Sequence, residues 1–301
     1  MHTNVIALGY QQNWWQILSS AFMRNALLGG TLVALAAGLI GYFIVVRNSA
    51  FAAHALAHIG FPGATGAVLV GLPVGAGLAV FCIGGALVIG ALGKRADERE
   101  VATGTVLAAA TGLGLFFSSL ATRSSSTVTN VLFGNLLAVT HQQLVTFAVA
   151  VAVLAAAVAF VYRPLLFASV NPAVAEAKGV PVRALSVLFM ALLGLAVTMA
   201  VQAVGTLLLF ALVVTPAATA IMLTARPGVA MAASTLLSVS GVWAGLALSA
   251  MFNVPPSFVI VMIVSAVWLL VRLGAQRTGA DLPTPPATHG AVGAEPARRI
   301  G

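Results

Sequence analysis

The sequence predicts an all-α integral membrane protein with eight or nine transmembrane helices, and three observations support this. The 301 residues are 60% hydrophobic and only 7% charged, whereas soluble globular domains carry about 25% charged residues. Apolar segments of roughly 20 residues, the length that an α-helix needs to cross the hydrocarbon core, follow one another along the chain. These segments are continuous rather than alternating in polarity, which favours helices over a β-barrel.

Nine apolar segments account for most of the chain. They cover residues 22–46, 50–70, 73–92, 101–121, 144–161, two segments within 185–223, and then 229–250 and 257–273. A single helix across 185–223 would be about 58 Å long, roughly twice the hydrocarbon thickness, so we expect a break at Gln202–Gly205. Eight spans result if one segment is re-entrant.

The stretches before and between the spans are polar. Residues 1–20 contain no Lys or Arg and include Trp14 and Trp15, a pair typical of a membrane interface. The sequence GKRADERE at 93–100 carries six charges in eight residues and is predicted to be a loop. Residues 162–184 are predicted to form the longest loop before the tail.

Basic residues orient the spans, because the cytoplasmic loops of membrane proteins are enriched in Lys and Arg. If 93–100 lies inside, twelve of the fourteen Lys and Arg lie inside too, and Arg24 and Arg123 are the exceptions. Residues 274–301 then form a cytoplasmic tail, predicted to be disordered from its composition, and 21–273 form the transmembrane domain. Charges scattered between spans reflect topology and not a surface for nucleic acid.

Motifs for catalysis are missing from the sequence. No GxxxxGK[ST] phosphate loop occurs, since Gly93 and Lys94 are followed by Arg95. The chain is therefore predicted not to be an enzyme. All six acidic residues fall outside the predicted spans. This weakens the alternative of a stand-alone secondary carrier, because proton-coupled carriers commonly place a carboxylate within a span.

His54 and His58 are the candidate metal-binding residues. They are one helical turn apart within the predicted span 50–70, so both side chains point from the same helix face. Imidazole is the commonest metal ligand among side chains. Two histidines in a span can also be core residues that bond to the backbone, and the residues alone leave both interpretations open.

Residues 171–181 predict a short helix between two spans on the cytoplasmic side. Asn171 is a suitable N-cap, Pro172 suits the first turn, and Gly179 suits the position after the C-cap. Such a helix can dock into a groove of another protein or lie on the membrane surface, and composition does not decide between the two.

Five stretches, in the same order and with matching spacing, resemble the permease subunits of the manganese, zinc and iron ABC importers, the ABC-3 family. They are FMRNALLGG (22–30), HALAHIGFPG (54–63), VLFGNLLAV (131–139), AEAKGVPV (175–182) and VQAVGTLLLFALVVTPAATA (201–220). The resemblance covers about residues 20–273. It implies the fold of a type II ABC importer permease in a multi-pass protein of the bacterial cell membrane.

The same resemblance implies partners and a cargo. It implies a homodimeric permease that works with cytoplasmic ATP-binding subunits and an extracytoplasmic metal-binding protein. A divalent metal, Zn²⁺ or Mn²⁺, is then the transported substrate and not a permanent cofactor. The coupling helix that contacts the ATPase would contain Ala175, Glu176, Ala177, Gly179, Val180 and Pro181.

The family pattern Asp-Ala-Leu-Ser-His, which implies a transient metal site, is altered in this chain. His58 matches the family histidine, whereas His54 stands in place of the aspartate. Nitrogen ligands suit Zn²⁺ better than Mn²⁺, which prefers oxygen, so the change leans weakly towards zinc.

Gln202 and Pro216 are further candidates, for the pathway or for a hinge. Gln202 can equally be a buried amide that bonds to a neighbouring helix, and Pro216 can simply kink a span. A related importer for a metal chelate or a vitamin is the alternative function. The paired histidines argue against it, because such a pathway needs a wider cavity and no metal ligands.

Overall fold

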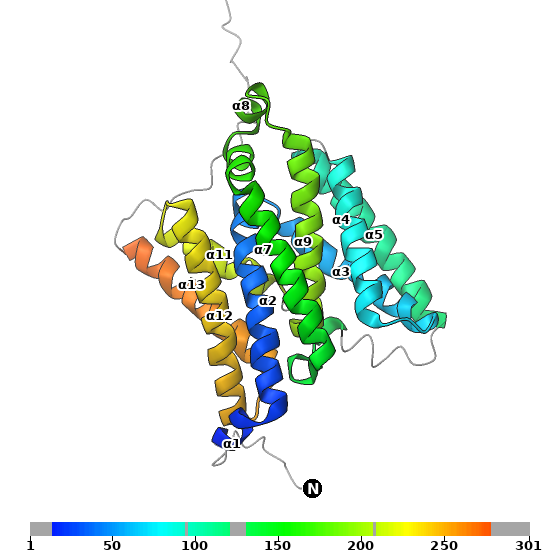
Figure 1. Cartoon of the computed structure of the whole chain (residues 1–301), viewed down its shortest axis with the longest axis vertical. Helices are drawn as coiled ribbons and strands as arrows, with labels where there is room; N and C mark the ends of the chain where they lie inside the picture. The colour runs from blue at the N-terminus through cyan, green and yellow to red at the C-terminus, as the bar shows by residue number, and fades with distance from the viewer. Residues whose placement is uncertain (1–13, 94–95, 121–130, 207–208, 278–301) are drawn as a thin grey trace, which may run out of the picture.

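The computed structural model describes residues 14–93, 96–120, 131–206 and 209–277, and its regular elements in these ranges are helices (Figure 1). In chain order they are α1 (Trp14–Ser19), α2 (Ala21–Val46), α3 (Ala50–Leu69), α4 (Val74–Leu92), α5 (Ala96–Leu120), the 3₁₀ turn η1 (Leu136–Ala138), α7 (His141–Val170), α8 (Pro172–Ala177), α9 (Val182–Val204), α10 (Leu209–Val213), α11 (Thr215–Leu223), α12 (Pro227–Phe252) and α13 (Pro256–Arg277).

In the described ranges, seven helices are long and apolar enough to cross a membrane, namely α2, α4, α5, α7, α9, α12 and α13. Helix α3 has 20 residues, but its two histidines lower its mean hydropathy. The short helices α10 and α11 stand in place of one predicted span. Each predicted apolar segment is therefore helical in the part of the chain that the structure describes, which confirms the all-α membrane fold.

Helices α2 and α9 lie at the centre of the bundle, whereas α13 and α5 lie on opposite sides of it (Figure 1). About two thirds of the apolar stretch of α2 and of α9 is buried within the protein, 67% and 72%, against 22% for α5 and 17% for α13. Lipid is as apolar as a protein interior, so hydropathy does not separate central helices from peripheral ones. Helix α8 lies at the end of the bundle opposite α1.

Helices α3 and α4 pack backbone against backbone at a pair of glycines. A Cβ added at Gly63 would lie 2.2 Å from the carbonyl oxygen of Gly77, and one added at Gly77 would lie 2.0 Å from that of Gly63. Small residues let membrane helices approach closely, and van der Waals contact then replaces the hydrophobic driving force that is missing in lipid. These two glycines fix the position of α3, the helix that carries the histidine pair.

The predicted break between two spans at Gln202–Gly205 is confirmed. Helix α9 ends at Val204, and Gly205 has a φ of +84°. A Cβ at Gly205 would lie 2.3 Å from the carbonyl oxygen of Leu132, so both the backbone angle and the close approach require glycine. The chain then continues through α10 and α11, with the junction between them at Val214.

The prediction of a loop at 93–100 is wrong in its second half. Helix α5 begins at Ala96 and includes Glu98, Arg99 and Glu100. Carboxylates are favourable in the first turn of a helix, because the helix dipole and the free N–H groups stabilise negative charge there. Charged residues at this point prolong the helix beyond the apolar span instead of ending it.

The loop predicted at 162–184 is also wrong in its first part. Helix α7 begins with a capping box between Thr140 and Gln143 and continues through Pro164 to Val170. A proline removes one helical hydrogen bond, but buried apolar side chains such as Leu165 hold this end of the helix against the core. Only α8 and its short connections separate α7 from α9.

Residues 274–277 of the predicted tail are helical, because α13 continues past residue 273 to Arg277. A cation in the last turn of a helix interacts favourably with its dipole. The rest of that tail, residues 278–301, lies outside the described residues. So do residues 1–13 of the predicted interfacial segment, whose remainder contains α1.

Candidate functional site

The histidine pair lies on α3, and the two imidazoles are neighbours. The ring centroids of His54 and His58 are 4.8 Å apart with the ring planes at 73°, and both side chains are half-buried. The ring of Phe210 from α10 lies 6.4 Å from that of His54. The spacing of four residues therefore produces the shared face that the sequence predicts, and the pair faces the segment just beyond the break after α9.

Within the described part of one chain, the two imidazoles are the side-chain ligands that this site offers. Among the described residues, no group of three or more His, Cys, Asp or Glu side chains lies close enough to hold a metal ion. Structural and catalytic zinc sites in proteins use three or four protein ligands. Two imidazoles are therefore an incomplete metal site, suited to brief contact with a passing cation or to completion by donors from outside the chain.

Pro62 supplies a further polar feature beside the pair. It lies inside α3, and a proline has no N–H to donate to the carbonyl four residues earlier. That carbonyl belongs to His58, so it lacks the donor that an ordinary helix would provide. A backbone carbonyl is a hard oxygen donor of the kind that Mn²⁺ prefers. Reasoning on side chains alone missed this oxygen, and the signal was the proline four residues after the second histidine.

Gln202 lies apart from the histidines, at the end of α9. Its Nε2 donates to the carbonyl of Thr198 at 3.1 Å, which turns its Oε1 towards Gly75 of α4. Gln202 lines a cavity of about 240 Å³ together with Asn135 and Gln143, and neither histidine is part of that lining. The pathway role predicted for Gln202 stays a prediction.

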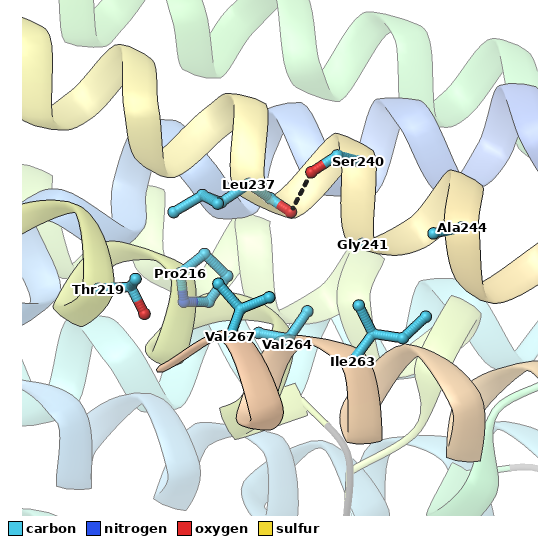
Figure 2. A pocket seen from close by; sticks show the side chains of 9 residues that line it. All are labelled: Pro216, Thr219, Leu237, Ser240, Gly241, Ala244, Ile263, Val264 and Val267. Atoms are coloured by element: carbon cyan, nitrogen blue, oxygen red, sulfur yellow. Dashed lines mark hydrogen bonds between the residues drawn. The ribbon is translucent and has the colours of Figure 1, made fainter. Parts of the chain in front are cut away.

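Pro216 lies in the first turn of α11, where the apolar helical stretch Leu209–Leu223 is interrupted at Val214. A proline cannot donate to the carbonyl four residues earlier, so the interruption lies where a proline kink is predicted. Pro216 lines an apolar pocket of about 150 Å³ with Thr219 and residues of α12 and α13 (Figure 2). The polar side chains beside it bond within their own helices, Thr219 to the carbonyl of Thr215 and Ser240 to that of Leu237. This pocket provides no convergent metal donors, and a hinge at Pro216 stays a prediction.

The short helix predicted at 171–181 is present as α8 with the expected caps. Asn171 Oδ1 accepts from the backbone N–H of Val174 at 3.1 Å, and Pro172 occupies the first turn. Gly179 has a φ of +81°, and the N–H of Val180 closes the turn on the carbonyl of Ala175 at 3.0 Å. Ala175 is buried, while Glu176, Ala177 and Gly179 are exposed. The helix is anchored on one side and presents the other outwards.

Arg47 is a residue whose role the sequence did not indicate. It follows α2 directly and precedes the histidine helix, and its guanidinium donates to the hydroxyls of Ser169 and Ser186, each at 3.1 Å. A single cation in the turn between the first two spans was the only available signal. Burial, and then the charge of Arg99, lower the pKa of Arg47 to about 10, so it stays protonated at neutral pH.

The sequence is similar to a known protein family and to several transport proteins. The ABC 3 transport family matches residues 19–274. A manganese transport system membrane protein, MntC, of Halalkalibacterium halodurans is 32% identical over 266 residues, covering 88% of this chain and 91% of that protein. The protein of the same name from Listeria innocua is 34% identical over 266 residues, covering 87% and 94%.

A solved structure has the same fold. PsaBC from Streptococcus pneumoniae, in complex with a Fab, superposes with a TM-score of 0.76 at 28% identity, covering 86% of this chain and 94% of the matched chain. Together with the helices described above, this likeness confirms the predicted permease fold.

Proposed function

The chain belongs to the ABC 3 transport family, and on that premise we propose that it is the membrane permease of an ATP-driven importer of a divalent transition metal. The observation that supports the cargo is the pair of adjacent imidazoles on α3, which lies in a bundle without other clustered metal donors among its described residues. A half-buried pair of neutral nitrogen ligands can bind a dication and release it again, as a transport pathway requires.

The relatives and the donor atoms point to different metals. The relatives carry manganese in their names, whereas two imidazoles favour zinc over manganese. The His58 carbonyl that Pro62 leaves without its helical donor adds an oxygen ligand, which moves the balance back towards manganese. We propose Mn²⁺ as the principal cargo, with Zn²⁺ as a competing cargo that the imidazoles admit.

Two copies of the chain complete the metal site in this proposal. Each copy contributes His54 and His58, so a symmetric pair of chains brings four imidazoles to one cation near the shared axis. Closed two-fold symmetry is the commonest arrangement of soluble homo-oligomers, and it places the same residues of both copies around the axis. The half-exposure of both rings supports this arrangement, because a fully buried pair could not meet a second copy.

The energy for transport comes from separate ATP-binding subunits. The sequence contains no phosphate loop of its own, and α8 presents the exposed residues Glu176, Ala177 and Gly179 at one end of the bundle (Figure 1). We propose that Ala175–Pro181 form the coupling element that docks on the ATPase. Nucleotide-driven movement of α8 then switches the pathway between outward-open and inward-open states, and an extracytoplasmic protein delivers the metal.

The test is metal uptake by the complete complex in proteoliposomes. We expect ATP-dependent accumulation of radiolabelled Mn²⁺ that excess Zn²⁺ inhibits. The variant with His54→Ala and His58→Ala should assemble with its ATPase but lose uptake. Inertness of the wild-type complex towards both metals, or normal uptake by the double variant, would contradict the proposal.

A further inference from the structure

Arg47 lies at the junction between the first two long helices of the bundle. It follows the last residue of α2 and stands three residues before α3 begins. The backbone of this junction is closed by hydrogen bonds, from the N–H of Arg47 to the carbonyl of Phe43 at 2.9 Å and from that of Ser49 to the carbonyl of Ile44 at 2.8 Å. Asn48 has a φ of +50°. This tight, hydrogen-bonded turn joins Arg47 directly to the first turn of the histidine helix.

The side chain of Arg47 reaches both ends of the segment that carries α8. Ser169 lies near the end of α7, two residues before the N-cap of α8, and Ser186 lies in the second turn of α9, the helix after α8. The guanidinium donates one N–H to each hydroxyl at 3.1 Å and stacks 5.0 Å from the ring centre of Phe189. One planar group therefore joins α2 and α3 to both flanks of the short helix.

Both serine hydroxyls can accept a hydrogen bond from Arg47. Ser169 uses its own proton to donate to the carbonyl of Leu165 at 2.6 Å, so its lone pairs are free to accept from Arg47. Ser186 accepts from Arg47 and also from Arg99 of α5 at 3.4 Å. The Nε atoms of both arginines are buried without a hydrogen-bond partner in the described part of the chain. Desolvated donors make the bonds to the two hydroxyls harder to replace with water.

We propose that Arg47 is a positioning residue that makes α8 and the histidine helix α3 move as one unit. This rests on the proposed function, because α8 is assigned there as the element that docks on the ATPase. When the ATPase moves α8, the flanks of α8 move with it, and Arg47 carries that movement into the turn before His54. Arg99 of α5, a helix that packs along α3, donates to Ser186 as well.

The transport test uses the permease with its ATP-binding and metal-binding partners in proteoliposomes, with activity referred to the amount of assembled complex. Arg47→Gln removes the charge and the fork of donors, and the paired variant Ser169→Ala with Ser186→Ala removes the acceptors but keeps Arg47. Arg24→Gln is the control, since it makes the same change at an exposed arginine at the other end of α2.

We expect metal taken up per ATP hydrolysed to fall about tenfold in both test variants while hydrolysis continues, because charge-assisted hydrogen bonds are lost. The control should keep the wild-type ratio. An unchanged ratio in both test variants overturns the inference, as does an equal fall of uptake and hydrolysis. Failure of the wild-type complex to transport metal would instead contradict the proposed function.

A second measurement does not depend on the cargo. Spin labels at Phe51 of α3 and Val174 of α8, both exposed in the native chain, report the distance between these helices in a Cys82→Ala background. We expect one narrow distance distribution with and without ATP when Arg47 is present. With Arg47→Gln the distribution should broaden and shift on ATP binding. A narrow, nucleotide-independent distribution in that variant overturns the inference.

Discussion

Two neighbouring imidazoles make up the candidate metal contact within a single chain, and the proposed function adds the backbone carbonyl of His58. The spacing of His54 and His58 was sufficient to predict that they share a helix face, and the structure places their rings 4.8 Å apart. The sequence could not show that Phe210 of α10 would lie beside them. Contacts within one helix follow from the helical repeat, whereas contacts between helices depend on packing.

Replacing His54 by Asp tests the origin of metal preference. His54→Asp exchanges a neutral nitrogen for a charged oxygen ligand, which favours Mn²⁺ over Zn²⁺. We expect the ratio of Mn²⁺ to Zn²⁺ uptake to rise by about tenfold, which corresponds to about 1.4 kcal/mol in relative affinity. Competitive uptake of both radiolabelled metals measures the ratio, with His54→Ala as the control for loss of the imidazole. A ratio that stays at the wild-type value would show that His54 does not contact the cargo.

Replacing Pro62 by Ala tests the proposed role of the His58 carbonyl, which Pro62 leaves without its usual helical donor. Pro62→Ala restores the N–H donor, so we expect a more stable helix, by up to about 3 kcal/mol, and weaker Mn²⁺ transport. Thermal unfolding in detergent and Mn²⁺ uptake measure the two effects. Uptake that rises together with stability would contradict a role for this carbonyl as a ligand.

At the scale of the helices, some sequence signals for helix ends predicted the structure correctly and others did not. The helix caps of α8 were predicted correctly, because they depend on residues within one turn of the helix end. Asn171 accepts a hydrogen bond at the start, and Gly179 adopts a positive φ after the end. Helix ends were wrong where charge was taken as a stop signal, as at the start of α5. A helix can continue into water as soon as its polar residues are in positions that its dipole favours.

The contact between α3 and α4 can be tested with two glycines on the same helix. Gly77→Ala places a methyl group against the carbonyl of Gly63, so we expect it to destabilise the protein by about 1–3 kcal/mol. Gly84→Ala is the matched control, because nothing lies within 4 Å of its added Cβ. That change should be neutral or stabilise by about 0.5–1 kcal/mol. Thermal unfolding of the two variants measures the difference in stability. Equal melting temperatures would contradict close packing at Gly63.

At the scale of the whole molecule, the peripheral helices expose large apolar faces that no other part of the described chain covers. Only 17% of the apolar stretch of α13 and 22% of that of α5 is buried within the chain. In a bilayer, lipid or a second copy of the chain covers such faces at little cost. Apolar exposure alone therefore does not locate an interface between copies, and the proposed pairing places it at the half-exposed histidines instead.

The proposed pairing of two chains predicts the stoichiometry of metal binding. If both copies share one site, we expect one Mn²⁺ or Zn²⁺ for every two permease chains, and none after His58→Ala. Elemental analysis of the purified permease after dialysis against the metal measures this ratio. One metal ion for each chain would show that the site is complete within a single copy.

The sequence by itself determined the membrane environment, the helical class, the shared face of the histidines and the caps of α8. These depend on hydropathy and on contacts within a few residues, which a linear pattern records. Tertiary structure decided which helices are central, that Gln202 and Pro216 line cavities apart from the histidines, and that Arg47 bonds to serines 122 and 139 residues away. The physical reason is that lipid and protein interior are equally apolar, so only packing distinguishes a face that meets another helix from one that meets the bilayer.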